Sequence, residues 1–196
     1  MSDGSAAEPD EVLWRAWEAM DLPEGCRGEV VEGAIEISAV GSLRHGVLLN
    51  RLCRALDGHL TGQGHQVWAG VIVLHGRKAW QPDLVVAPID MEAVGDEDGY
   101  GITASGVRTV IEVVSPGRQN TQRDRVRKRR EYARAGISVY VLVDDFDGDG
   151  AVVVLTSPDP AKAAYTDEHR VPYGKDAVVP SGPAEGFVIG SDLTGA

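Results

Sequence analysis

The sequence predicts a mixed α/β (α+β) domain in which a mixed β-sheet is flanked by helices and preceded by a β-hairpin. Three observations predict this fold class. Residues 29–37 alternate as a hairpin does, residues 42–60 form a core-helix pattern, and residues 107–143 contain a strand, a helix and a further strand. The chain has 196 residues, of which 43% are hydrophobic, so it can bury one compact core. We expect residues 1–9 to form a flexible N-terminus and residues 10–196 to form one domain.

The N-terminal third predicts two helices separated by the hairpin. Residues 10–20 repeat large apolar side chains, including Trp17, at helical spacing. In residues 29–37, apolar and acidic residues alternate around the pair Glu32-Gly33, which suits a tight turn between two strands. Ser42 can cap a second helix that ends near Leu60 and carries leucines on one face.

The rest of the chain predicts a sheet interrupted by one loop and one helix. Strands are expected where β-branched and apolar residues cluster, over residues 66–74, 83–87, 107–114 and 137–143. Residues 91–105 are acidic and rich in glycine, so we expect an exposed loop there. A basic helix spans about residues 121–135 and ends at Gly136. Antiparallel strands at residues 151–156, 170–173 and 177–179 complete the sheet, and residues 191–196 close the chain.

The charge of the chain is unevenly distributed. The net charge is −11, which argues against a protein that coats nucleic acid through a uniformly basic surface. Residues 118–134, however, contain eight of the nineteen lysines and arginines and only two acidic residues. This segment carries +6 and leaves −17 for the remainder. Such a run is typical either of a solvated helix face or of an anion-binding surface, and the sequence leaves both open.

Other features limit the class of protein. The chain has no run of about 18 apolar residues, and its first ten residues are small and acidic, so we expect neither a membrane span nor a signal peptide. We expect a cytoplasmic protein with no membrane partner. Cys26 and Cys53 lack the spacing of metal ligands, and we expect both to be thiols. Residues 145–150 begin like a calcium-binding loop, but Thr156 occupies the position that requires a glutamate, so a turn is expected.

Two acidic residues stand out because they interrupt apolar strands. Asp83 follows Pro82 at the start of one predicted strand, and Glu112 lies inside the next. A buried carboxylate costs several kcal/mol unless a cation, a hydrogen bond or a proton compensates it. Each residue alone could mark a strand edge or pair with an arginine. Together they favour a divalent cation held by oxygen ligands, and magnesium suits that chemistry.

The basic helix offers a cation close to these acids. Asp124, Lys128 and Tyr132 are spaced four residues apart, so they lie on one helix face. The chain uses fifteen arginines and only four lysines. A lysine inside an arginine cluster indicates a requirement for a compact point charge.

These segments, taken in order, resemble one protein family. They are EVVEG at 29–33, the helix that contains His45, PDLVV at 82–86, IEVVSPGR at 111–118, the helix with Lys128, and GISVYVLVD at 136–144. The series resembles the Uma2 family of restriction endonucleases, within the PD-(D/E)XK nuclease superfamily. The resemblance covers most of the chain and implies a restriction-endonuclease-like fold.

The resemblance also implies a set of site residues. Asp83 and Glu112 would bind Mg²⁺, with Mn²⁺ as a substitute, and the backbone carbonyl of Val113 and the side chain of Glu29 would be further ligands. Lys128 would be the catalytic lysine, because Val114 stands where the superfamily usually has one; Arg127 and Arg129 are the fallback cations. His45, Asp124 and Tyr132 would line the site, and Arg118, Arg123 and Arg127 would bind phosphates. From the residues alone, Glu29 could equally be a surface residue of the hairpin, and His45 could be an ordinary core or surface histidine.

The function expected from this resemblance is magnesium-dependent hydrolysis of phosphodiester bonds by an endonuclease. The expected partner is nucleic acid, DNA in preference to RNA, and we expect a homodimer. The alternative is a non-catalytic nucleic-acid-binding protein, or a homodimeric interaction protein, that keeps the nuclease fold. An acidic protein that meets a basic partner ranks last.

Overall fold

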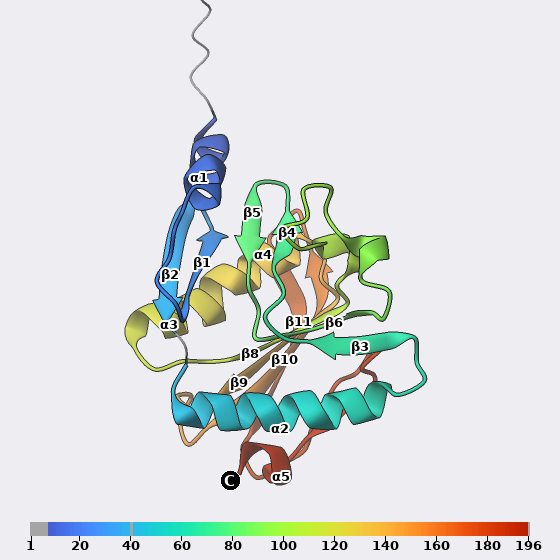
Figure 1. Ribbon diagram of the computed structural model, residues 1–196. Helices are drawn as coiled ribbons and strands as arrows, with labels where there is room; N and C mark the ends of the chain where they lie inside the picture. Colours follow the sequence, from blue (N-terminus) through green and yellow to red (C-terminus); the bar gives the residue numbers. More distant parts are fainter. Residues whose placement is uncertain (1–7, 40, 196) are drawn as a thin grey trace, which may run out of the picture.

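The computed structural model describes residues 8–39 and 41–195, and it has the mixed α/β fold that the sequence predicts (Figure 1). The helices are α1 (Pro9–Glu18), α2 (Leu43–Leu60), α3 (Arg118–Gln122), α4 (Arg129–Arg134) and α5 (Ser191–Thr194). A π-helix, η3 (Arg123–Lys128), joins α3 to α4, and the 3₁₀ turns are η1 (Glu92–Val94) and η2 (Ala104–Gly106). The expected flexible N-terminus lies largely outside the described residues, and Pro9 already belongs to α1.

The strands form two main sheets and a small one. The six-stranded sheet has the order β11 (Ala164–Pro172), β10 (Ala151–Asp159), β9 (Val139–Asp144), β8 (Thr109–Val113), β6 (Leu84–Pro88) and β3 (His65–Trp68). The five-stranded sheet has the order β2 (Ala34–Ala39), β1 (Cys26–Val31), β5 (Lys78–Trp80), β4 (Val73–His75) and β7 (Ile102–Thr103). β12 (Ala177–Val178) pairs with β13 (Val188–Ile189).

The central strands of the six-stranded sheet, β10, β9, β8 and β6, are largely buried on both faces, whereas most of the edge strand β11 is exposed. The odd-numbered residues of β8, such as Ile111, pack against the leucines of α2, which crosses one face of the sheet (Figure 1). The even-numbered residues of β8, such as Val110, pack on the other face with Tyr132 of α4 and Trp80 of β5. Because strand side chains alternate between faces, each central strand needs apolar residues at nearly every position. A charged residue in such a strand is therefore exceptional.

The crossover and the hairpin agree with the sequence prediction. β8 and β9 are parallel neighbours joined by α3, η3 and α4, which is the predicted strand, helix and strand unit. β1 and β2 are antiparallel and are joined by Glu32 and Gly33, both with positive φ, at 45° and 73°. Positive φ at both positions is characteristic of the type I′ turn, whose twist matches the right-handed twist of the two strands.

Several predicted elements are wrong in extent. Residues 66–74 form two strands in different sheets, because the chain turns at Gly70, whose φ is 72°. The predicted helix over 121–135 begins at Arg118 and contains the π-helix, and the predicted strand over 107–114 begins at Thr109. The strand at 170–173 is the end of β11. The strand at 177–179 pairs outside the main sheet, and the loop over 91–105 contains β7 and two 3₁₀ turns.

Candidate active site

Strand register brings Asp83 and Glu112 together. Leu84 of β6 pairs with Ile111 of β8 in antiparallel register, so the next pair along the ladder is Asp83 opposite Glu112. Asp83 accepts a hydrogen bond on Oδ2 from the Val113 backbone N–H at 2.9 Å, and its own N–H donates to Glu112 Oε2 at 3.4 Å. The two side chains are only 5% and 1% exposed. The sheet thus holds the two predicted carboxylates side by side, as the sequence led us to expect.

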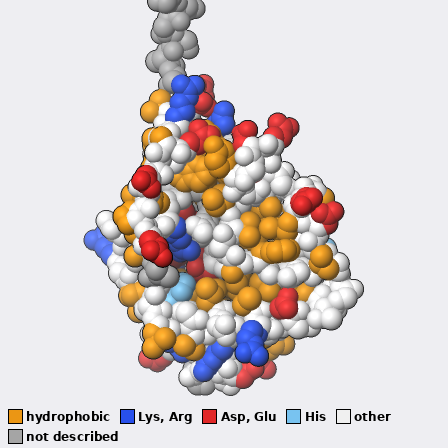
Figure 2. All heavy atoms as spheres, in the orientation of Figure 1, with side chains coloured by type: hydrophobic (Ala, Val, Ile, Leu, Met, Phe, Trp, Pro, Cys, Tyr) orange, Lys and Arg blue, Asp and Glu red, His pale blue; other side chains and the backbone are white. Residues whose placement is uncertain are grey.

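Asp83 reaches solvent through a cleft of about 630 Å³ between the β1–β2 hairpin and the start of α2. Figure 2 shows the molecule hollowed beside the hairpin, where acidic, basic and histidine atoms are visible. The polar side chains that line the cleft include Arg27, Ser42, His45, Gln81, Asp83, Ser115, Asn120 and Arg123. Glu112, Lys128 and Glu29 do not line it; they lie in the protein behind Asp83. The cleft therefore exposes one of the two carboxylates.

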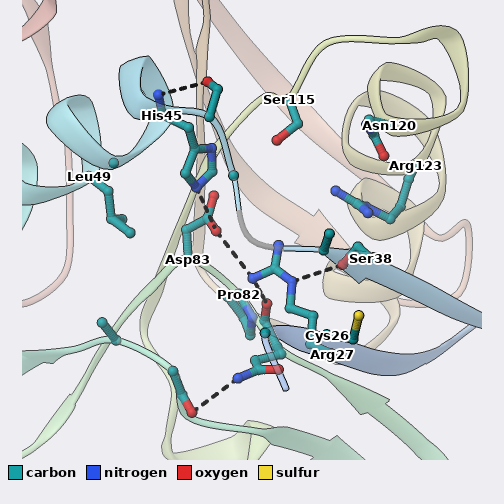
Figure 3. Close-up of a pocket in the computed structure, with 18 of the residues that line it drawn as sticks. Cys26, Arg27, Ser38, His45, Leu49, Pro82, Asp83, Ser115, Asn120 and Arg123 are labelled. Atoms are coloured by element: carbon teal, nitrogen blue, oxygen red, sulfur yellow. Dashed lines mark hydrogen bonds and ion pairs between the residues drawn. The ribbon is translucent and has the colours of Figure 1, made fainter. Parts of the chain in front are cut away.

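Two cationic side chains approach the same oxygen of Asp83. His45 Nε2 and Arg27 Nη1 each lie 3.4 Å from Asp83 Oδ1, and both point toward it in Figure 3. Burial raises the pKa of Asp83, but the contact with His45 and the charges of Arg27 and Lys128 outweigh burial and lower it to about 2. The contact with Asp83 raises the pKa of His45, against the effect of burial. The Asp83 carboxyl is thus held ionised.

Glu112 is surrounded by polar partners inside the protein. Lys128 Nζ lies 2.8 Å from Glu112 Oε1 and 2.9 Å from Glu29 Oε1, so one buried ammonium group bridges two carboxylates. The Tyr132 hydroxyl donates to Glu112 Oε1 at 2.6 Å. Glu29 also accepts from the Gln81 N–H at 2.6 Å, and its Oε2 is buried without a hydrogen-bond partner among the described residues. Lys128 and Tyr132 are both fully buried.

The charges of this cluster shift its protonation. Burial raises the pKa of Glu112 to about 7; Lys128 acts in the opposite direction, but the carboxylates of Asp83, Asp124 and Glu29 add to the effect of burial. Burial lowers the pKa of Lys128, but Glu112 and Glu29 outweigh it and raise the pKa above its ordinary value. The carboxylates thus raise both pKa values, that of Glu112 in addition to burial and that of Lys128 against it.

The π-helix turns Arg123, Asp124 and Lys128 inward, and all three are buried. π-helical turns are rare and occur frequently at functional sites. Arg123 donates to Asp124 at 2.8 Å and lines the cleft, whereas Asp124 does not. The Tyr140 hydroxyl donates to the backbone carbonyl of Asp124 at 2.9 Å. Of the predicted helical residues, Lys128 and Tyr132 contact Glu112 directly, and Asp124 contributes charge nearby.

The basic segment is largely neutralised by acidic residues from other elements. Arg125 pairs with Asp144 at 2.6 Å, Arg129 with Glu168 at 2.9 Å, and Arg130 and Arg134 with Glu32 at 2.5 and 3.1 Å. Arg127 pairs with Glu36 and also donates to the Val31 carbonyl at 3.0 Å. Within the described chain, Arg118 is the one cation of the segment without an ion pair, and it is exposed.

The donor set fits a hard divalent cation that takes few protein ligands. Across residues 8–39 and 41–195, no group of three or more His, Cys, Asp or Glu side chains forms a complete metal site. Asp83 Oδ1 and Glu112 Oε2 nevertheless hold only long 3.4 Å contacts, which leaves an oxygen on each carboxylate for a stronger partner. Mg²⁺ is usually bound by one or two carboxylates, with water and phosphate filling its other positions. The N–H of Val113 points toward Asp83, and in a β-strand the carbonyl of the same residue points to the same side.

Sequence reasoning missed Arg27 and the polar side chains across the cleft, Ser115 and Asn120. Arg27 precedes Glu29 by two positions on β1, so both side chains leave the same face of the strand. The two-residue repeat of a β-strand can be read from the sequence, so it could have identified Arg27 as a neighbour of Glu29. Ser115 lies in the irregular segment after β8, and Asn120 lies in the five-residue helix α3, which is too short to show an apolar periodicity that would indicate its direction.

Comparisons with known proteins identify the family and the fold. The model of the Uma2 family, described as "Putative restriction endonuclease", matches residues 14–179. A crystal structure from Anabaena variabilis, described as that of "a putative nuclease belonging to DUF820", shares the fold with a TM-score of 0.68 at 15% identity, and the match covers 93% of this chain and 97% of that one. No curated protein matched. No helix in the described part of the chain is long and apolar enough to cross a membrane. The resemblance inferred from the motifs is confirmed, and the chain belongs to the Uma2 family.

Proposed function

We propose that this protein is a metal-dependent endonuclease that hydrolyses phosphodiester bonds of nucleic acid, DNA in preference to RNA, in the cytoplasm. One observation carries the proposal: two buried carboxylates on adjacent strands, Asp83 and Glu112, lie side by side, and Asp83 lines an open cleft. Burying two acids side by side is costly in a purely structural role, because each ionised carboxylate must be compensated inside the protein. Membership of the Uma2 family supports the same reaction class.

Asp83 and Glu112 would hold Mg²⁺, or Mn²⁺ in its place, through Asp83 Oδ1 and Glu112 Oε2, with the Val113 carbonyl as a third ligand. Glu29 pairs with Lys128, and its Oε2 has no hydrogen-bond partner among the described residues. Glu29 would therefore contact the metal through a water molecule. When bound, the metal supplies positive charge to phosphate oxygens and makes a neighbouring water a stronger acid. The strands supply rigidity, because both ligands come from paired β residues rather than loops.

Lys128 and Tyr132 would act by positioning Glu112. Both contact Glu112 Oε1, which leaves Oε2 directed toward the Asp83 backbone. Lys128 is fully buried and does not line the cleft, so its geometry favours charge compensation of Glu112 over direct contact with a substrate. Among the cations of the helix, Arg123, which lines the cleft, and the exposed Arg118, which lines the hollow beside it, are best placed for phosphates.

Metal binding tests the proposal without knowledge of the substrate. Calorimetry with Mg²⁺ and Mn²⁺ should show binding to the wild type and little or none to Asp83→Asn or Glu112→Gln. Asp144→Asn is the matched control, because Asp144 is also a buried strand carboxylate but pairs with Arg125 away from the cleft. Plasmid, single-stranded DNA and RNA cleavage should then follow the same order among the variants.

The outcomes separate the enzyme from its alternative. A wild type that binds metal at these residues but cleaves none of the three substrates would favour a nucleic-acid-binding protein that keeps the nuclease fold. A folded wild type that binds no metal, even with nucleic acid present, would overturn the proposal. We also propose a homodimer, and a monomeric mass in light scattering would refute that part alone.

A further inference from the structure

Arg27 is the cation of the cleft that is least firmly paired. Its Nε donates to Ser38 Oγ at 3.1 Å, and its Nη1 lies 3.3 Å from the Gln81 carbonyl and 3.4 Å from Asp83 Oδ1. Among the described residues, Nη2 has no hydrogen-bond acceptor. The side chain is 25% exposed, and its guanidinium points into the cleft (Figure 3). The Nε hydrogen bond therefore fixes the Arg27 side chain, while its Nη2 group remains available to donate to a ligand.

The contact between Arg27 and Asp83 uses the same oxygen that a metal would need. Asp83 Oδ2 is occupied by the Val113 N–H at 2.9 Å, so Oδ1 is the oxygen that faces the cleft. Arg27 and His45 each approach Oδ1 at 3.4 Å, close to the outer limit of a hydrogen bond. A magnesium ion binds its oxygens at about 2.0–2.1 Å, and a dication at that place repels a guanidinium at its side. Arg27 would therefore lose its carboxylate partner if a divalent cation bound at Asp83.

We propose that Arg27 neutralises Asp83 in the metal-free protein and binds a phosphate oxygen of the nucleic acid once a divalent cation occupies Asp83. The inference rests on the proposed function and adds a substrate-binding residue to it. A guanidinium suits this exchange, since its planar fork pairs equally well with carboxylate and with phosphate. Its Nε anchor to Ser38 lets Nη1 and Nη2 change partner while the stem remains in place.

The surface next to Arg27 could hold further phosphates of a bound nucleic-acid backbone. A second hollow of about 390 Å³ adjoins the cleft, sharing Ile37, Asn120 and Arg123 with it. Arg118 and Gln119 extend this hollow along the start of the basic helix. Most other arginines of that helix are committed to carboxylates within the chain. A backbone bound at Arg27 would therefore continue past Arg123 toward Arg118.

The test compares two affinities in Arg27→Gln and Arg27→Lys. Calorimetry measures Mg²⁺ binding without nucleic acid, and fluorescence anisotropy measures binding of a short labelled DNA, single-stranded or duplex, with Ca²⁺ occupying the oxygen site. Removing the competing charge should tighten Mg²⁺ binding to Arg27→Gln by about tenfold and weaken DNA binding by about tenfold or more. Arg27→Lys should lie between the wild type and Arg27→Gln. Opposite signs are the signature, because a merely structural loss would lower both affinities.

Arg125→Gln is the matched control. Arg125 also pairs with a buried strand carboxylate, Asp144, but it lines neither hollow, so both affinities should stay within about twofold of the wild type. If the wild type binds Mg²⁺ and Arg27→Gln keeps its DNA affinity, or loses both affinities together, the role of Arg27 is refuted while the proposed function stands. A wild type that binds no Mg²⁺ overturns both.

Discussion

The clearest quantitative expectation concerns Glu112 in the metal-free protein. Burial and neighbouring carboxylates raise the pKa of Glu112 from 4.5 to about 7. Between these values the folded state keeps a proton that the unfolded state has lost, so the free energy of unfolding must fall as pH rises through this window. At about 1.4 kcal/mol per pH unit, the loss attributable to Glu112 is about 3 kcal/mol between pH 4.5 and pH 7. Replacing the carboxyl by an amide, in Glu112→Gln, removes that part of the pH dependence.

The assay is urea unfolding with a chelator present, at a series of pH values from 4.5 to 8. The wild type should lose about 3 kcal/mol more than Glu112→Gln across this range. Adding Mg²⁺ should reduce the difference, because a divalent cation favours the ionised carboxylate. The comparison isolates Glu112 from His45, whose raised pKa gives both proteins a loss in the same direction. Parallel curves for the two proteins would refute the reasoning that the Glu112 charge is under-compensated.

Three further outcomes follow from the same cluster. Lys128→Met should destabilise the fold by about 3–5 kcal/mol in chemical denaturation, because it leaves buried carboxylates unpaired, and adding Glu112→Gln should recover part of the loss. Tyr132→Phe should cost about 2 kcal/mol in the same assay, since it removes a buried hydrogen bond to a charged group. Gly41→Ala would place a Cβ 2.5 Å from the His45 ring, so the ring must turn away from Asp83. The pKa of His45, followed by NMR titration, should then fall toward 6.5; an unchanged pKa would contradict this geometry.

The parts of the site that the sequence could predict are those that break a local pattern. Asp83 and Glu112 were identifiable because a carboxylate inside an apolar strand has few structural explanations. Lys128 was identifiable as a lysine among arginines, and it does bridge buried acids. The hairpin was predictable because Glu32-Gly33 needs only local backbone geometry. In each case the physical cause acts within a few residues of the chain.

The parts that could not be predicted depend on residues distant in sequence. The split of residues 66–74 between two sheets is decided by which strands lie beside each half, and periodicity carries no such information. The fate of the basic segment depends on Glu32 and Glu36 from the hairpin and Glu168 from β11. Composition alone left a solvated face and an anion-binding surface equally open, and the structure adds a third role, in which the helix is tied to the sheets by ion pairs.

The charges of the cluster give a reason why the proposed metal and phosphate would bind together. The carboxylates are Glu29, Asp83, Glu112 and Asp124, and the permanently charged cations beside them are Arg27, Arg123 and Lys128. Counted with all four acids ionised and His45 neutral, the cluster carries −1, and the raised pKa values of Glu112 and His45 show that proton uptake relieves this charge in the metal-free protein. A divalent cation reverses this to +1, and one phosphodiester neutralises it. In the proposed mechanism a metal ion and a phosphate would together balance the deprotonated cluster, and the release of Arg27 from Asp83 would make room for the phosphate.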